Sequence, residues 1–131
     1  MFQSIEIPRC KLPSGREVSI IDVLKFFYDL NETDVIILLK LSREGGKTLE
    51  ELSQSISMSK ASISRSISKL HSLGFISRKK ITGKMIRGRP KYIYDIDREK
   101  VLRDILENIN KCSEVAKSII DNLFRSEEKT M

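Results

Sequence analysis

The sequence predicts a mainly α-helical protein with one small β-hairpin, followed by a long C-terminal helix. Apolar residues recur at the spacing of a helix in four segments, at about 20–30, 32–43, 49–56 and 59–73. Two short strand-like segments, 75–81 and 92–96, flank a basic loop that contains Gly83 and Gly88. Apolar residues at alternating spacings of three and four then continue through 98–124.

Residues 1–18 contain Pro8, Pro13 and Gly15 and show no sustained period, so we interpret them as an arm with a short strand at 4–7. The first helix is indicated by five apolar residues on one face, Ile20, Val23, Leu24, Phe27 and Leu30. In the next helix, residues 35–39 are all apolar, which predicts a central, buried helix. Asn31 is its expected N-cap.

Gly45 and Gly46 are expected to end this second helix. The third helix is predicted to begin with a capping box, in which Thr48 and Glu51 occupy the two required positions. For the fourth helix we expect Ser59 as N-cap and Gly74 just beyond the C-terminus. Its core-facing stripe is predicted to consist of Ile63, Ile67, Leu70 and Leu73.

The third and fourth helices are joined by a tight turn, which is typical of a helix-turn-helix unit. The hairpin that follows is expected to be its wing. The predicted division is therefore an arm (1–18), a winged helix-turn-helix DNA-binding domain (19–97), a dimerisation helix (98–125) and a tail (126–131).

The distribution of charge indicates a polyanionic partner. No aspartate or glutamate occurs from Ser53 to Tyr94, whereas this segment carries ten of the 24 lysines and arginines. The other 14 basic residues are outnumbered by the 18 acidic ones, so this basic band holds all of the positive excess. Double-stranded DNA is the expected partner, and a merely solvated basic face is the alternative.

Other classes of function are disfavoured by composition. The two cysteines are far apart in the sequence and His71 is the only histidine, so neither a zinc site nor a nucleophile–histidine pair is expected. We expect no enzyme activity, no cofactor and no metal. No apolar run reaches the roughly 20 residues of a membrane span, and no secretory signal is recognisable, so a cytoplasmic location is expected.

Several segments resemble winged helix-turn-helix transcription regulators. These are 48–52, 59–65, Lys69-Leu70 and 73–76. The end of the wing, at 88–94, is similar to that of archaeal TrmB-like regulators, and the plan of helices flanking a winged domain resembles the MarR-like dimers. The resemblance covers about residues 30–97. It implies a DNA-binding regulator in which the fourth helix, about 59–73, reads the DNA.

That recognition helix is expected to enter the major groove of DNA, with Arg65 reading guanine and Ser62 assisting. Ser59 and Lys60 are expected to contact the backbone, because the first turn of the helix carries no acid. The complete set of predicted DNA-binding residues is Ser59, Lys60, Ser62, Ser64, Arg65, Lys69, Arg78, Lys79, Lys80, Lys84, Arg87, Arg89 and Lys91.

Two modes of binding remain open for the wing, about 78–91. The stretch Arg87-Gly88-Arg89-Pro90 matches the core of an AT-hook, which predicts insertion into an A·T-rich minor groove. Alternatively, the wing contacts only phosphates, as we expect for Arg78, Lys79 and Lys80.

The C-terminal helix is about 27 residues long, or roughly 40 Å, too long to be buried against so small a domain. We therefore expect it to pack on a second copy, with an intramolecular hairpin with the first helix as the alternative. The predicted dimer interface is Leu102, Ile105, Ile109, Cys112, Ala116, Ile119 and Leu123. Paired Cys112 thiols across the dimer would make it redox-sensitive, which is a hypothesis only.

Together these features predict a homodimeric, sequence-specific transcription regulator. Its binding site is expected to be pseudo-palindromic, with possible A·T-rich flanks. The alternatives are a non-specific architectural DNA-binding protein and a winged-helix component of the transcription or replication machinery.

Overall fold

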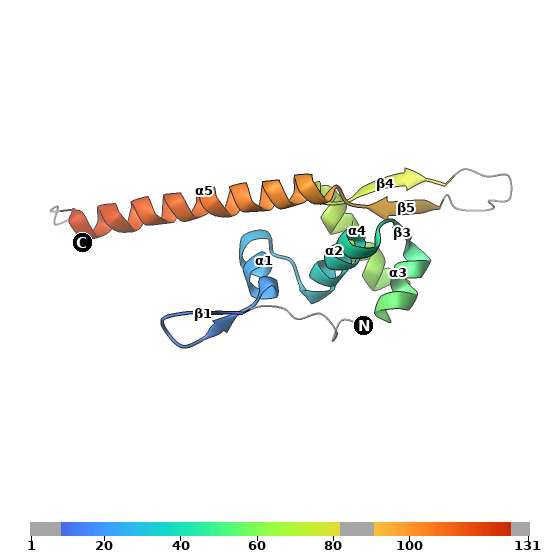
Figure 1. The fold of residues 1–131 in the computed structure, drawn as a ribbon, viewed down its shortest axis with the longest axis horizontal. Coiled ribbons are helices and arrows are strands. Elements are labelled where there is room, and N and C mark those ends of the chain that lie inside the picture. Colours follow the sequence, from blue (N-terminus) through green and yellow to red (C-terminus); the bar gives the residue numbers. More distant parts are fainter. Residues whose placement is uncertain (1–8, 82–90, 127–131) are drawn as a thin grey trace. The chain divides into compact units, whose positions relative to one another are not determined.

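The computed structural model describes residues 9–81 and 91–126. They fall into two units, one that ends at Asp97 and one that begins at Arg98. The first unit contains helices α1 (Ile20–Tyr28), α2 (Glu32–Glu44), α3 (Leu49–Ile56) and α4 (Lys60–Ser72) (Figure 1). The second unit is helix α5 (Arg98–Arg125). The predicted fold class, mainly α with a small hairpin and a long C-terminal helix, is confirmed.

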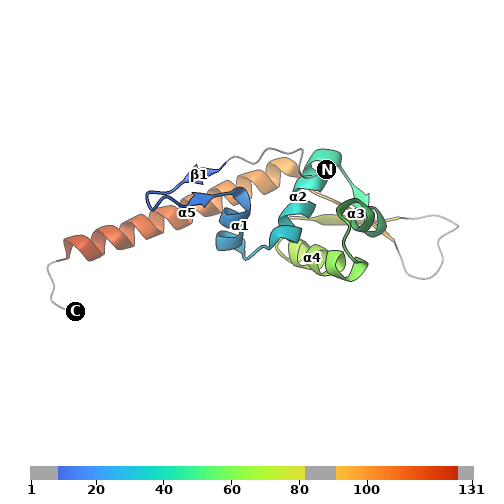
Figure 2. The same ribbon diagram turned by 90° about the horizontal axis from the view of Figure 1, so that it is seen from below.

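The helices of the first unit enclose an apolar core. Helix α4 packs against both α2 and α3, and these three helices lie close together in Figure 2. Side chains with no exposed surface come from all three helices and include Ile37, Leu52 and Ile63. Helix α2 contributes four buried apolar residues, as expected for the central helix. This core fixes how α4, the predicted recognition helix, is presented.

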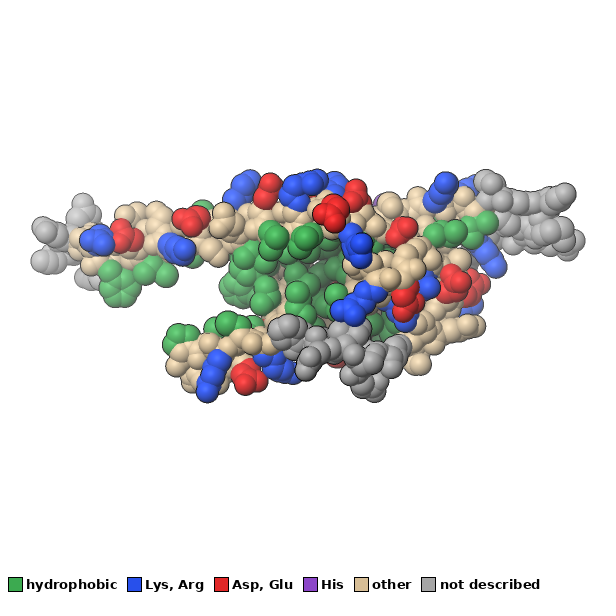
Figure 3. All heavy atoms as spheres, in the orientation of Figure 1, with side chains coloured by type: hydrophobic (Ala, Val, Ile, Leu, Met, Phe, Trp, Pro, Cys, Tyr) green, Lys and Arg blue, Asp and Glu red, His purple; other side chains and the backbone are tan. Residues whose placement is uncertain are grey.

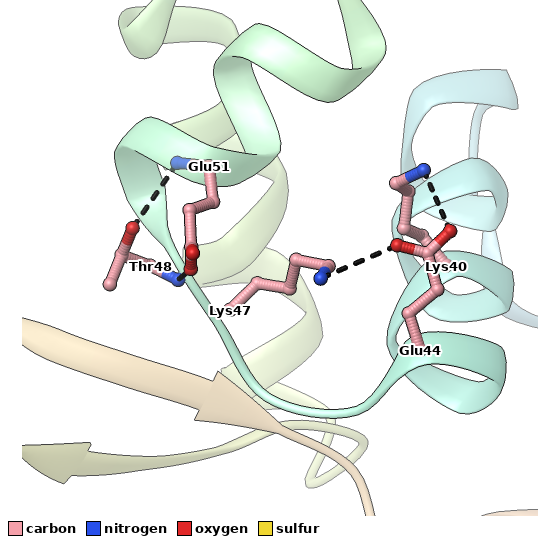
Figure 4. Close-up of polar contacts among 5 residues, drawn as sticks. All are labelled: Lys40, Glu44, Lys47, Thr48 and Glu51. Atoms are coloured by element: carbon pink, nitrogen blue, oxygen red, sulfur yellow. Dashed lines mark hydrogen bonds and ion pairs between the residues drawn. The ribbon is translucent and has the colours of Figure 1, made fainter.

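Local capping signals set the helix ends as the sequence predicts. The Thr48 hydroxyl accepts from the Glu51 amide at 3.2 Å, and the Glu51 carboxylate accepts from the Thr48 amide at 2.8 Å (Figure 4). Asn31 caps α2 and Ser59 caps α4. Gly74, with φ +79°, follows α4 in the left-handed conformation.

The core-facing stripe of α4 differs from the prediction at its last position. Ile63, Ile67 and Leu70 are buried, but Leu73 is 40% exposed. Leu73 is the C-cap, where the chain leaves the helix, so the helical period no longer directs its side chain. Ser66 is buried on this face instead.

Three strands form the larger of the two sheets described in the first unit. The wing strands β4 (Ser77–Lys80) and β5 (Tyr92–Asp95) are antiparallel, with Arg78 opposite Tyr94. A third strand that the sequence does not reveal, β3 (Lys47–Thr48), pairs with the other edge of β5. The order β3-β5-β4 ties the base of the wing to the segment between α2 and α3.

The arm also contains a small hairpin of β1 (Cys10–Lys11) and β2 (Glu17–Val18). Its turn is closed by hydrogen bonds between Leu12 and Arg16 and between Gly15 and Leu12, each 2.8 Å. The strand expected at 4–7 lies outside the described residues. No helix in the described part of the chain is long and apolar enough to cross a lipid bilayer.

Candidate nucleic-acid interface

The turn between α3 and α4 is fixed by its own polar groups. Ser57 ends α3 in the left-handed conformation, with φ +62°, and its amide donates to the Ser53 carbonyl at 2.9 Å. The Ser53 hydroxyl donates to the Met58 carbonyl at 2.6 Å. Ser59 then caps α4. The two helices thus form a helix-turn-helix unit whose turn is held by short hydrogen bonds.

The exposed side of α4 carries most of the predicted recognition residues. Ser59, Lys60, Ser64 and Arg65 are exposed, and Ser62 is half-buried. The Ser59 hydroxyl accepts from the Ser62 amide at 3.1 Å and donates to the Ser62 hydroxyl at 3.1 Å. Arg65 in turn donates to the Ser62 hydroxyl at 3.3 Å. These bonds hold the Arg65 guanidinium beside the acid-free first turn of the helix.

Lys69, another predicted DNA contact, has partners inside the domain. Its ammonium lies 2.7 Å from the Asp34 carboxylate and also donates to the Asp29 carbonyl at 3.2 Å. The Asp34 side chain is completely buried, whereas 40% of the Lys69 side chain is exposed. The pair connects the recognition helix to the first turn of α2.

A cleft of about 290 Å³ opens on the same side of α4. Ser62, Arg65 and Lys69 line it from the recognition helix, and Asn31 and Thr33 line it from the start of α2. The lining is mostly polar and includes the two cations together with the carboxylate of Asp34. The surface beside the recognition helix is therefore hollowed, and the charged groups that line it sum to +1.

On the wing, the described basic residues are exposed but differ in their surroundings. Arg78, Lys79 and Lys80 all lie on β4. The Arg78 guanidinium lies over the ring of Tyr92, 4.5 Å from its centroid, in a cation–π contact. Lys91 precedes β5. Lys84, Arg87 and Arg89, together with the AT-hook-like stretch, lie outside the described residues.

One acidic residue of this surface was missed by sequence reasoning. Glu50, in the first turn of α3, lies 4.0 Å from the Lys60 ammonium and 3.7 Å from that of Lys91. All three side chains are between 43% and 62% exposed. Glu50 lies just before the acid-free band in the sequence, and the fold brings it between two of the cations of that band.

Three carboxylates at helix ends show how local hydrogen bonds lower a pKa. The Thr48 amide lowers the pKa of Glu51, and the Ser19 amide lowers that of Asp22 in the same way. The pKa of Glu44 is lowered by its hydrogen bonds with Lys40 and Lys47, shown in Figure 4. All three groups therefore stay ionised to a lower pH than an ordinary carboxyl group does.

Metal-ligating side chains do not cluster among the described residues. These residues contain no group of three His, Cys, Asp or Glu side chains that could hold a metal ion. His71 is exposed, and Cys10 and Cys112 are exposed free thiols.

The helix-turn-helix unit also matches a known family. The MarR family model matches residues 30–83, from just before α2 to just past β4. Over these residues the chain is similar to the MarR family. The match covers α2, α3 and the recognition helix α4, and it includes the first strand of the wing.

Solved structures with this fold cover between 76% and 92% of the chain. A possible transcriptional regulator from Methanosarcina mazei Go1 is 22% identical, with a TM-score of 0.71 over 92% of this chain and 98% of that one. A protein of the thermoacidophilic archaeon Sulfolobus tokodaii is 29% identical, with a TM-score of 0.62 over 76% and 92% of the two chains.

A third similar structure is the transcriptional regulator BldR from Sulfolobus solfataricus. It is 22% identical, with a TM-score of 0.50 over 85% of this chain and 72% of that one. No curated protein matches the chain. The MarR-family match confirms the predicted class, a winged-helix, DNA-binding transcription regulator. The solved structures show that the chain shares the fold.

The predicted dimer residues all lie on α5. In the single chain Leu102, Ile119 and Leu123 are between 53% and 64% exposed. Cys112 and Ala116 are exposed, and Ile105 and Ile109 are half-buried. Other large apolar side chains widen this exposed stripe, namely Leu106, Val115, Ile120 and Phe124. Figure 3 shows hydrophobic side chains gathered on one side of the helix toward its C-terminal end.

Proposed function

We propose that this MarR-family protein binds a pseudo-palindromic site in double-stranded DNA as a homodimer and so regulates transcription in the cytoplasm. The observation that carries the proposal is the surface of α4, on which Lys60 and Arg65 are exposed and the N-terminal turn carries no acid. A helix of this kind fits the major groove of DNA. The enzyme class has no support from the MarR-family match or from the regulators that share the fold.

In this proposal Arg65 reads a guanine through two hydrogen bonds, and Ser62 orients its guanidinium. Ser59, Lys60 and Ser64 contact the adjoining backbone or bases. We assign Lys69 a positioning role, because it is already paired with the buried Asp34.

The wing supplies further backbone contacts. In this proposal, DNA phosphates are contacted by exposed cations of the β4–β5 hairpin, namely Arg78, Lys79, Lys80 and Lys91. We include Lys84, Arg87 and Arg89 in the proposed wing surface on the basis of the sequence alone. They are proposed to contact either the minor groove or the phosphates. Each phosphate neutralised by these cations adds about 0.9 to the slope of log affinity against log salt.

The exposed apolar stripe of α5 supports the homodimer. Seven large apolar side chains of this 28-residue helix are more than half exposed in the single chain. An isolated apolar surface of this kind is unfavourable in water and typically marks an interface. A second copy of α5 offers the same stripe, so we propose that the two copies bury it together. The resulting two-fold axis requires two half-sites about one or two DNA turns apart.

Selection of binding sites from a random duplex pool tests the proposal. The purified protein should enrich an inverted repeat at near-physiological salt. A pool that stays random while the protein still binds would instead indicate an architectural protein or a component of larger machinery. A protein that binds no duplex even at low salt would contradict the proposal altogether.

The dimer is tested separately by sedimentation. Leu123→Glu places a charge in the exposed stripe of α5 and should shift the protein to a monomer with weaker operator binding. Asn110→Asp, a similar charge change at an exposed polar position of the same helix, should leave the dimer intact. Equal masses for both variants would show that α5 is not the interface.

A further inference from the structure

In the described part of the proposed DNA-binding surface, an exposed carboxylate lies among the cations. The basic band from Ser53 to Tyr94 has no acid of its own, yet Glu50 lies within 4.0 Å of two of its lysines, Lys60 and Lys91. Those lysines belong to different parts of the interface. Lys60 begins the recognition helix, and Lys91 precedes the second wing strand.

Glu50 contributes little to holding the fold together. Both ion pairs are long and their partners are well exposed to solvent, and pairs of this kind have small effects on stability. The contrast is with Asp34, which pairs with Lys69 in the interior of the same domain. The position of Glu50 therefore matters mainly for what approaches this surface from outside.

A DNA backbone that approaches this surface meets Glu50 together with its two lysines. The three side chains present a net charge of +1 rather than the +2 of the lysines alone. When the two lysines bind phosphates instead of Glu50, the Glu50 carboxylate remains close to those phosphates and repels them. Both effects weaken binding, and both act on the backbone, whatever the base sequence.

We propose that Glu50 is an electrostatic brake on DNA binding: it lowers the affinity of the recognition helix and wing for the phosphate backbone. The inference rests on the proposed DNA-binding function. Its physical consequence is faster release from DNA that lacks a matching site, because backbone contacts supply nearly all of the affinity for such DNA.

Glu50→Gln tests the brake because it removes the charge and keeps the shape of the side chain. The chain offers a matched control in Glu44, which also bridges two lysines, Lys40 and Lys47, and is similarly exposed (Figure 4). Neither of those lysines is a proposed DNA contact. Glu44→Gln therefore makes the same charge change outside the proposed interface.

Affinity for a random-sequence duplex is measured by fluorescence anisotropy over a range of salt concentrations, after both variants are shown to melt like the wild type. We expect Glu50→Gln to bind roughly three- to tenfold more tightly per bound subunit at low salt. The magnitude of its salt slope should rise by about 0.9 per subunit. Glu44→Gln should match the wild type.

A double variant checks that the effect is one of net charge at this cluster. Glu50→Gln combined with Lys60→Gln restores the net charge of +1 and should return the salt slope to nearly the wild-type value. Unchanged or weaker binding by Glu50→Gln would overturn the brake, and weaker binding would show that Glu50 positions its lysines for DNA. If the wild type itself binds no DNA, the proposed function fails. If the wild type binds DNA and Glu50→Gln binds with the same affinity, this inference alone fails.

Discussion

Replacing Lys69 with methionine is expected to lower the free energy of unfolding of the first unit by about 2–3 kcal/mol. The reason is that the substitution removes a hydrogen bond to a charged group and leaves that charge buried. The Asp34 side chain is completely buried, and its Oδ2 accepts from the Lys69 ammonium at 2.7 Å and from the Asn31 amide at 2.9 Å. Its Oδ1 has no hydrogen-bond partner. Methionine keeps the length of the lysine stem but leaves this carboxylate with one backbone donor.

The magnitude follows from the difference in burial between the two partners. Breaking a fully buried ion pair typically costs about 3–5 kcal/mol, because an uncompensated charge stays in the interior. Lys69 is 40% exposed, so water can approach its position in the variant and recover part of that loss. We therefore place the expected effect below that range.

Urea unfolding followed by circular dichroism measures the effect. Lys40→Met is the control, because Lys40 pairs at 3.0 Å with Glu44, which is 47% exposed, and the loss of such a partner should cost less than about 1 kcal/mol. The sharper test is Asp34→Asn in the Lys69→Met background. Removing the buried charge there should restore stability. The reasoning is refuted if Asp34→Asn destabilises that background further, or if Lys69→Met is no worse than Lys40→Met.

Three further predictions follow from single contacts. Gly46→Ala should destabilise the fold by about 1–3 kcal/mol in urea unfolding, because an added Cβ would lie 2.7 Å from Cγ2 of Ile93. The lowered pKa of Glu51, caused by the Thr48 amide, adds stability at neutral pH that is lost as the pH falls below 4.5; unfolding of Glu51→Gln should therefore depend less on acid than that of the wild type. Arg65→Ala should reduce discrimination at one base pair of the selected site by roughly 1–3 kcal/mol in competition binding, and an unchanged base preference would exclude Arg65 as a reader.

Features encoded by neighbouring residues could be predicted from the sequence. The Thr48–Glu51 capping box, the Ser59 cap and the left-handed Gly74 all occur where their local patterns predict them. Each depends on hydrogen bonds or backbone angles within a few positions, so no knowledge of the tertiary fold is needed. The helices and the wing strands follow for the same reason, to within a few residues at their ends.

Features that depend on the tertiary fold could not be predicted. Strand β3 has two residues, Lys47 and Thr48, too few to show an alternating pattern, and it exists because β5 offers a free edge. The Asp34–Lys69 pair joins residues 35 positions apart. The capping pattern explains why Asp34 follows Asn31, but no local signal predicts that the same carboxylate receives a lysine from the recognition helix.

The two ion pairs made by the recognition helix have different effects because one carboxylate is buried and the other is exposed. Lys69 meets a carboxylate with no exposure, so the pair acts on the fold and sets the position of α4. Lys60 meets a carboxylate that is 43% exposed, so that pair acts on what binds from outside. Counting lysines and arginines in the basic band therefore overstates the charge that DNA meets, because Lys60, Lys69 and Lys91 are each paired with an acid from outside the band. A salt slope calculated from all ten basic residues should consequently exceed the measured slope. Glu50→Gln should bring the measured slope closer to the calculated one. Asp34→Asn should mainly alter the stability of the fold.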